Sequence, residues 1–414
     1  MNRTIAGILN TLVVLAIGTS VARAELSVRT DFENASAEVI AVHQESGLIQ
    51  MRPAGDPKRG WPCWWSFQVD GIESGRTLTV EVDRVPGNLS AAWAQPGFAA
   101  YSIDGGKTWL QTEKGVAKEG RKSYAARIDA KSAWFAWGPV FDVGDAHELV
   151  DRLAAEHPYV TKFELARSRD GRGVPAIVVD EKPADVEDAS RFGLWIQARQ
   201  HAWESGGSWV GVGFIEWLTG DDPRAAALRR QAIVTFVPVM DVDSVATGNG
   251  GKNQVPQDHN RDWSAAPHFP EVAAAQKRIA ELDKAGRLDL FVDLHNPAPS
   301  DLRPFFFVSP DEELNPTGRR NLATFVAAAK GEIVGPLVLS PNTKPSGANY
   351  SPQWQAISKN WVTMNCRPHV VAVTLETSWN TEHSTTAGYT TVGRQLGLAI
   401  EKYLRESPRS AAGE

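Results

Sequence analysis

The sequence has little cysteine and few long apolar runs. Cys63 and Cys366 are the only cysteines among 414 residues, so no framework of disulfides carries the fold, although one bridge between these two remains open. Beyond the apolar run from Ile5 to Val21, no second run follows that could cross a membrane as a helix. Internal repeats and low-complexity stretches are also missing, which excludes repeat architectures.

Strong charge of either sign is missing as well. The net charge of -6 and the isoelectric point near 5.9 give no electrostatic reason to expect nucleic acid as a partner. The apolar fraction of 42% is typical of globular proteins, and the length favours two domains. Tryptophan, in contrast, is abundant: fifteen residues that serve either as large core side chains or as walls of a wide substrate cleft.

Residues 1–24 have the pattern of a secretory signal peptide. Arg3 precedes the apolar run and the small-residue triplet Ala22-Arg23-Ala24 follows it, so we expect cleavage before Glu25. A retained membrane anchor is the alternative, although the run is short for a membrane span. The mature protein is therefore expected to be periplasmic or secreted, without stable membrane insertion.

The spacing of apolar residues predicts two domains. Residues 25–144 contain short alternating runs such as LTVEVDRV and SYAARIDA between Gly, Asp and Pro turns, which predicts an all-β sandwich. Residues 145–408 begin with helical spacing in DAHELVDRLAAEHP, and strand-like apolar runs then alternate with longer helical segments. This pattern predicts an α/β domain with a mixed, largely parallel sheet that is covered by helices on both faces.

A histidine and a glutamate follow the apolar run FGLWIQA. His201 and Glu204 have the spacing H-x-x-[DE], which nine histidines and 49 acidic residues produce roughly once by chance. This pair directly follows a predicted strand and precedes a predicted helix, where both side chains can reach one metal ion. Two further matches lie in a loop rich in proline and polar residues: His259 with Asp262, and His268 with Glu271.

Other strand ends supply the remaining parts of a metal site. His295 ends the run LDLFVDLHN and offers a third ligand; two histidines and a glutamate are an established set for catalytic zinc. Glu376 ends VVAVTLETS, where a carboxylate can act as a base. Asn260 and Arg261 offer an amide and a guanidinium suited to a carboxylate. Each residue alone also fits an ordinary turn or solvent-exposed position.

The order of these motifs resembles a known family. HAWE, then NR, then the histidine of DLHN and the glutamate of TLETS are similar to the zinc metallocarboxypeptidases, in particular the cytosolic carboxypeptidase-like branch. A β-sandwich that ends in FAWGPVFDV resembles the additional domain of that branch. The resemblance therefore covers nearly all of the mature chain.

The resemblance implies a zinc metallocarboxypeptidase with a peptide or protein C-terminus as its substrate, and the signal-peptide pattern implies that it is exported. His201, Glu204 and His295 would bind one zinc ion, and Glu376 would be the general base. Asn260 and Arg261 would hold the terminal carboxylate of the substrate, and Asp258 would orient a zinc-bound histidine.

The sequence also departs from the family. Its members usually have another arginine upstream of Asn-Arg that stabilises the developing oxyanion, but no arginine lies between Met240 and Asn260. Lys252 could substitute as a point charge. Tyr350, in SGANYSPQW, is the candidate for the family's substrate-capping tyrosine. Much of the branch prefers acidic C-terminal residues, and three basic residues could line such a cleft or be surface charges: Arg303, Lys344 and Arg367.

Two other functions fit the same residues. The site could be a zinc amidase that acts on cell-wall peptides or acylated amino acids. The chain could also be a catalytically weak protein that binds peptides or glycans and keeps zinc for structure. The glutamate at position 376 favours catalysis, because a site without chemistry needs no base. Oligomeric state is left open by the sequence.

Overall fold

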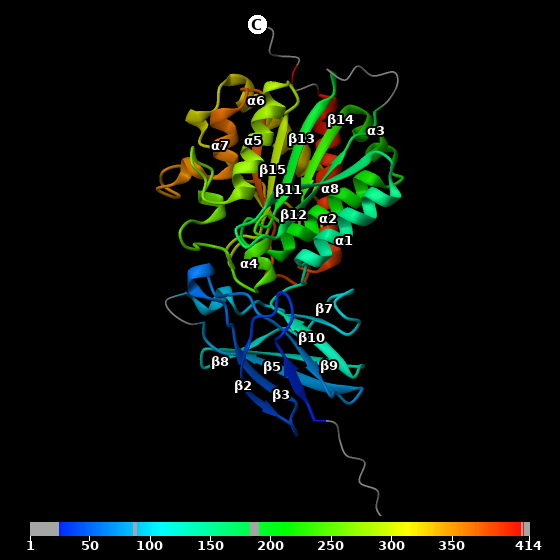
Figure 1. The fold of residues 1–414 in the computed structure, drawn as a ribbon, viewed down its shortest axis with the longest axis vertical. Helices are drawn as coiled ribbons and strands as arrows, with labels where there is room; N and C mark the ends of the chain where they lie inside the picture. The colour runs from blue at the N-terminus through cyan, green and yellow to red at the C-terminus, as the bar shows by residue number, and fades with distance from the viewer. Residues whose placement is uncertain (1–24, 86–88, 183–189, 407–408, 410–414) are drawn as a thin grey trace, which may run out of the picture.

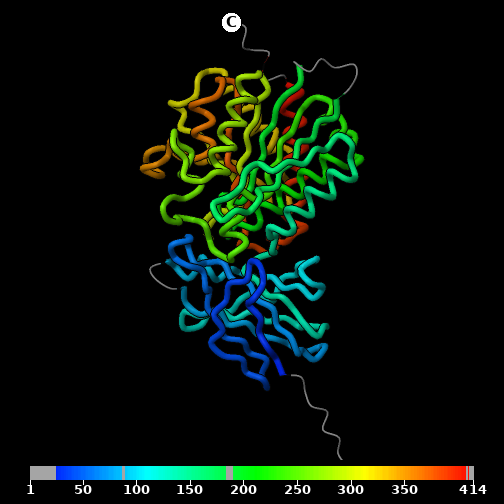
Figure 2. Tube along the Cα trace, viewed as in Figure 1, coloured from blue at the N-terminus to red at the C-terminus, as the bar shows by residue number. Residues whose placement is uncertain are grey.

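The structure is a computed structural model that describes residues 25–85, 89–182, 190–406 and 409. The expected signal peptide, residues 1–24, lies outside the described residues. Figure 2 shows the N-terminal region, blue to cyan, packed against the remainder of the chain.

Two five-stranded sheets form the N-terminal region, in the orders β1-β4-β10-β6-β7 and β2-β3-β5-β9-β8. Their facing apolar side chains share one core that includes Trp65, Val80 and Phe135. This confirms the prediction of an all-β N-terminal region. The strands are β1 Ser27–Arg29, β2 Glu38–His43, β3 Leu48–Arg52, β4 Ser66–Asp70, β5 Arg76–Val82, β6 Ala100–Ser102, β7 Leu110–Gln111, β8 Val116–Lys118, β9 Arg121–Ile128 and β10 Ser132–Ala136.

An eight-stranded sheet follows, in the order β11-β12-β14-β13-β15-β18-β16-β17. Its four central strands, β14-β13-β15-β18, are parallel. The pairs β11-β12, β12-β14 and β18-β16 are antiparallel, and β16 and β17 are parallel. The predicted mixed, largely parallel sheet is therefore confirmed. The strands are β11 Val160–Arg167, β12 Gly173–Val179, β13 Phe192–Ala198, β14 Ala232–Val237, β15 Leu290–His295, β16 Phe305–Val308, β17 Lys344–Pro345 and β18 Val371–Glu376.

Helices cover both faces of this sheet (Figure 1). The side chain of Asp293 accepts a hydrogen bond from Ser358 at the start of α7, while the next residue of β15, Leu294, lies close to Gly211 of α2. Because successive side chains of a strand point to opposite faces, α7 and α2 lie on opposite sides of the sheet. The helices are α1 Val143–Glu156, α2 Ser205–Thr219, α3 Pro223–Gln231, α4 Val242–Ala246, α5 Pro270–Lys284, α6 Pro316–Glu332, α7 Ser358–Asn365 and α8 Thr386–Arg405.

The first helix begins two residues before the predicted start at Asp145. Asp142 caps it: the Asp142 carboxylate accepts the backbone N–H of Asp145, and the Asp145 carboxylate accepts that of Asp142. This reciprocal capping satisfies two backbone donors that the helix itself leaves unpaired. The chain thus passes within a few residues from the end of β10 to the start of α1.

Both cysteines are free thiols, so the bridge that the sequence left open is not formed. Cys63 is buried in the N-terminal core, and Cys366 follows the end of α7. Within the described residues, no helix has the combination of length and apolar character that crossing a membrane requires.

Candidate metal centre

Three ligand-type side chains meet at the carboxyl edge of the large sheet. His201 and Glu204 follow β13, and His295 is the last residue of β15, the parallel neighbour of β13. Their ligand atoms all lie within 4.8 Å of one another, and all three side chains are buried. Parallel neighbours end at the same edge of a sheet, which explains how residues 94 positions apart (295 − 201) come together.

Hydrogen-bonding atoms orient both imidazole rings toward the same carboxylate. Nδ1 of His201 lies 2.8 Å from Oε1 of Glu204, and Nδ1 of His295 lies 2.7 Å from its Oε2. On the far side of each ring, Nε2 of His201 lies 3.0 Å from Asp258 and Nε2 of His295 lies 3.0 Å from Asp293. Carboxylates that hold the outer nitrogen of a ligand histidine are typical of zinc sites, so this donor set fits a zinc ion.

Asp293 did not stand out in the sequence. It lies inside an apolar strand and is fully buried. A single acidic residue inside such a run matches no sequence motif. The signal that could have identified it is the period of two, because Asp293 and His295 point to the same face of β15.

The charges of the centre favour a cation. Burial would raise the pKa of Glu204, but the imidazoles of His201 and His295 outweigh it and lower that pKa to about 2. Burial acts on Asp258 in the same way and is outweighed by Lys252 and His201, so the pKa of Asp258 is also lowered. Both carboxylates therefore stay ionised at neutral pH.

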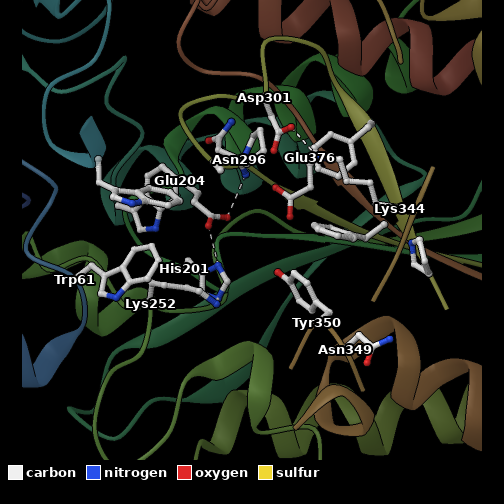
Figure 3. Close-up of a pocket in the computed structure, with 17 residues that line it drawn as sticks. Trp61, His201, Glu204, Lys252, Asn296, Asp301, Lys344, Asn349, Tyr350 and Glu376 are labelled. Atoms are coloured by element: carbon white, nitrogen blue, oxygen red, sulfur yellow. Dashed lines mark hydrogen bonds and ion pairs between the residues drawn. The ribbon is translucent and has the colours of Figure 1, made fainter. Parts of the chain in front are cut away.

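Glu376 ends β18 and pairs across the strands with His295. It is 8% exposed, and its Oε2 has no hydrogen-bond partner among the described residues. Burial raises the pKa of Glu376 to about 8, with a further contribution from Glu204, against the opposing effect of His295 and Lys252. Glu376 lines a cavity with His201 and Glu204, as Figure 3 shows. A buried, unpaired carboxyl group at this place can exchange a proton with a bound molecule.

The Asn-Arg pair lies beside the centre, in the short 3-10 helix η4, His259–Arg261. Asn260 Nδ2 is 3.3 Å from Nε2 of His295, and its Oδ1 accepts the backbone N–H of Ser358. The guanidinium of Arg261 lies 5.6 Å from the ring centre of Tyr350. Arg261 and Tyr350 line a second, smaller cavity that adjoins the centre.

Lys252 takes a position next to the candidate ligands. Its Nζ is 3.4 Å from Nε2 of His201 and 3.2 Å from Oδ2 of Asp258. It lines both the smaller cavity and the larger one. A cation is therefore available beside the three candidate ligands.

The basic residues that the sequence offered as lining residues lie in three different places. Lys344 lines the larger cavity, where its Nζ is 2.6 Å from Asp301. Arg303 is exposed, and Arg367 pairs with Asp283. A further basic residue of the smaller cavity, besides Arg261 and Lys252, is Lys359, which the sequence did not suggest because a lysine on a short helix is usually a surface charge.

Lys359 is fully buried, and its Nζ donates a hydrogen bond to Asn360 at 2.5 Å. Burial, together with nearby Arg261, holds its pKa well below the usual range for lysine. The neutral amine has two N–H groups and the charged form has three, so Lys359 can still donate to a group that enters the smaller cavity.

Comparison with known proteins finds similarity to carboxypeptidases in the second part of the chain. Residues 146–305 match the zinc carboxypeptidase family Peptidase_M14. Cytosolic carboxypeptidase 1 of Danio rerio is 30% identical over 157 residues, which are 36% of this chain and 14% of that protein. Cytosolic carboxypeptidase 4 of Homo sapiens is 36% identical over 146 residues, 33% of this chain and 13% of its own length. The chain thus matches only a small part of these relatives.

Solved structures show the same fold over most of the chain. The metallo-carboxypeptidase of Burkholderia cenocepacia has a TM-score of 0.78 at 19% identity and covers 92% of this chain and 99% of its own. The metallo-carboxypeptidase of Pseudomonas aeruginosa in complex with (2-guanidinoethylmercapto)succinic acid has a TM-score of 0.74 at 22% identity, with 92% and 100% covered. Residues 146–305 thus match the zinc carboxypeptidase family model, and the chain has the metallocarboxypeptidase fold.

Proposed function

We propose that the protein is an exported, zinc-dependent carboxypeptidase that hydrolyses the C-terminal peptide bond of peptides. The observation that carries the proposal is the position of Arg261 and Asn260. They line a small cavity that adjoins the cluster of His201, Glu204 and His295. Arg261 can pair there with the terminal carboxylate of a peptide whose last peptide bond lies at the centre.

Zinc held by His201, Glu204 and His295 would supply a Lewis acid that polarises the scissile carbonyl and makes water more acidic. Glu376 would accept the proton of the attacking water and pass it to the leaving amine. The burial of Glu376 and its unpaired Oε2 support this role, because such a carboxylate can accept a proton from a molecule bound at the centre. Lys252 would stabilise the negative charge that develops on the carbonyl oxygen.

The smaller cavity supports a preference for acidic C-terminal residues. Lys359 lines it together with Arg261 and Tyr350. Arg261 would hold the terminal carboxylate, which leaves Lys359 free to donate to a side-chain carboxylate. A carboxylate brought close to a buried lysine also favours the charged form of that lysine.

The pattern of residues 1–24 supports export. Substrates would then be peptides of the periplasm or of the medium. Mass spectrometry of the purified protein from the native cell tests this: we expect a mature N-terminus at Glu25, and recovery of the uncleaved chain from the cytoplasm would reject export.

A peptide library tests the activity. Peptides that vary in the last residue are incubated with the zinc-loaded protein and with Glu376→Gln, and the products are identified by mass spectrometry. We expect the loss of single C-terminal residues with the wild type, and a rate at least about a hundredfold lower with Glu376→Gln. The zinc content of both proteins is measured, since the variant should still bind the metal.

The other outcomes separate the competing functions. A wild type that releases no residue from any peptide but hydrolyses cell-wall fragments or acylated amino acids would be an amidase. A zinc-containing protein that hydrolyses neither class would be a binding protein. Full activity of Glu376→Gln would reject the role of Glu376.

A further inference from the structure

The larger cavity reaches from the metal centre to the N-terminal β region. It has a volume of about 530 Å³ and is lined by His201, Glu204 and Glu376 as well as by Trp61 and Trp93. Trp61 follows the 3-10 helix η1, Pro57–Arg59, and Trp93 ends η2, Ala91–Trp93. Figure 3 shows Trp61 across from Glu376, on the side of Lys252 and His201. The strand-rich region therefore contributes a wall of the cavity.

This wall is the outer edge of a tryptophan cluster. The ring centres of Trp61 and Trp93 are 4.7 Å apart, and Trp93 meets the edge of Trp203 at 5.7 Å. Behind them, Trp137 and Trp379 pack on Trp203 at 5.3 and 5.9 Å. The inner three are buried, whereas Trp61 and Trp93 are only partly buried. Two indoles on a packed aromatic base thus present apolar surface to the cavity.

Backbone hydrogen bonds fix this wall relative to the metal centre. The N–H of Trp61 donates to the carbonyl of Lys252 at 2.9 Å, and the N–H of Gly251 donates to the carbonyl of Arg59 at 2.9 Å. The N–H of Val255 donates to the carbonyl of Lys58 at 2.8 Å. A wall held in this way loses little conformational freedom when a ligand binds, which favours affinity.

The two cavities define the direction of a bound peptide. They share His201, Lys252, Tyr350 and Glu376, so they meet at the metal centre. Phe307 also lines both cavities, and it pairs across the strands with Lys344, which lines the larger cavity. The Lys344 end of the larger cavity therefore adjoins the smaller cavity, where the terminal residue would bind. The tryptophan end is the part that leads away from the terminal pocket.

We propose that Trp61 and Trp93 form a subsite for an apolar or aromatic side chain in the part of the peptide that precedes the scissile bond. The inference rests on the proposed carboxypeptidase function, since it uses the direction in which Arg261 would orient the peptide. It makes the N-terminal β region a part of the substrate site. Partly exposed indoles bind apolar side chains by burying apolar surface of both partners.

Matched peptides test the subsite. We use acetylated pentapeptides with one constant C-terminal residue and vary the three preceding positions among Ala, Leu, Phe and Glu. For the zinc-loaded full chain we expect kcat/KM to rise roughly tenfold when one of these positions changes from Ala to Leu or Phe. The same ratio is measured for Trp61→Ala and Trp93→Ala, in which we expect it to approach one.

Trp134→Ala is the control. Trp134 lies on β10 of the same region and is partly buried, but it lines neither of the two cavities. It should keep the preference of the wild type. Trp61→Phe is a second variant that retains an aromatic ring; it should keep more of the preference than Trp61→Ala, and it keeps the test valid if the alanine variant does not fold.

The outcomes distinguish the subsite from the activity. A wild type that releases C-terminal residues with equal kcat/KM for Ala, Leu and Phe peptides overturns the subsite and leaves the carboxypeptidase intact. A preference that survives in both tryptophan variants, or a preference for Glu at these positions, overturns it too. A wild type that cleaves no peptide overturns the proposed function, and the subsite with it.

Discussion

Asp258 and His201 form a buried carboxylate–imidazole pair, with Oδ1 of Asp258 3.0 Å from Nε2 of His201. The same carboxylate accepts the backbone N–H of Asn253 and of Asn260. It therefore fixes both the ring that faces Glu204 and the loop that carries Lys252. The contact with Nε2 orients the His201 ring so that its Nδ1 faces the candidate metal position. Asp258 therefore connects the position of the Lys252 loop with the orientation of a metal ligand.

Asp258→Asn should weaken zinc binding. The amide keeps an acceptor oxygen but loses the negative charge that supports the imidazole, so we expect zinc affinity to fall roughly 10- to 100-fold. Competition with a chromophoric chelator measures the dissociation constant. Asp262→Asn is the control, because Asp262 is buried in the same loop but accepts from His268 and Phe269 instead. Equal affinities of Asp258→Asn and wild type would contradict the role.

Lys252→Met should slow turnover without loss of zinc. The methionine keeps the length of the side chain but removes the positive charge beside the metal centre, where we propose that the scissile carbonyl binds, so we expect kcat to fall roughly 100- to 1000-fold. Lys252→Arg keeps the charge and should retain more activity than Lys252→Met. Steady-state kinetics and zinc content measure both effects. A Lys252→Met protein with the kcat of the wild type would exclude Lys252 from catalysis.

Lys359→Met should change which terminal residue is preferred. Removing a buried amine that lines the smaller cavity would take away the proposed partner of an acidic terminal side chain. We therefore expect kcat/KM for peptides ending in Glu to fall at least about tenfold, while peptides ending in Leu are affected less. The ratio of the two values is the measurement, and an unchanged ratio would reject Lys359 as a specificity residue.

The parts of the fold that could be predicted are those with a strong local pattern. The run FGLWIQA coincides with β13, and the helical spacing of DAHELVDRLAAEHP lies over α1. Continuous apolar strands identify the parallel centre of a sheet, and polar residues that follow them lie at its carboxyl edge. The cluster of His201, Glu204 and His295 could be expected for this reason.

Residues that act through distant contacts had no local signal. Trp61 and Trp93 reach the cavity because the β region packs on the loop of Lys252. The residues next to them in the sequence give no sign of this packing. His259 shows that a matching spacing can also mislead. It forms the pattern H-x-x-D with Asp262, but in the structure its Nε2 lies 2.6 Å from Glu271. Spacing alone cannot separate such a buried ion pair from a metal ligand.

Gly60→Ala should disturb the Lys252 loop. Gly60 has a φ of 108°, and a Cβ atom there would lie 2.4 Å from the backbone nitrogen of Gly251. Relieving this contact must shift Arg59 or Gly251, and with them Lys252. We expect kcat/KM to fall at least about tenfold, because displacements of about 1 Å at a reacting group are costly.

Gly105→Ala separates this displacement from backbone strain. Gly105 also has a positive φ, 80°, but no atom lies within 4 Å of an added Cβ. It should lose about 1 kcal/mol of stability and keep its activity. If Gly60→Ala and Gly105→Ala retain equal kcat/KM after correction for the folded fraction, the loop does not position Lys252.

His259 should make stability fall in alkaline solution. It is the first residue of η4 and is fully buried; burial would lower its pKa, but Asp241 and Glu271, with a contribution from Asp258, raise it to about 9. In the unfolded chain a histidine titrates near 6.5. The stabilisation by the charged ring is therefore complete below about pH 6.5 and is lost as the pH rises through about 9.

His259→Gln should remove this dependence. The glutamine cannot carry the charge that Asp241 and Glu271 stabilise, so the free energy of unfolding should be lower at pH 6 by roughly 1 to 3 kcal/mol. Between pH 7 and 9 it should then change less than that of the wild type. Urea unfolding at pH 6, 7, 8 and 9 with saturating zinc measures both. His383→Gln, at an exposed position, should keep the wild-type slope; the same slope in His259→Gln would mean that His259 is not charged in the folded protein.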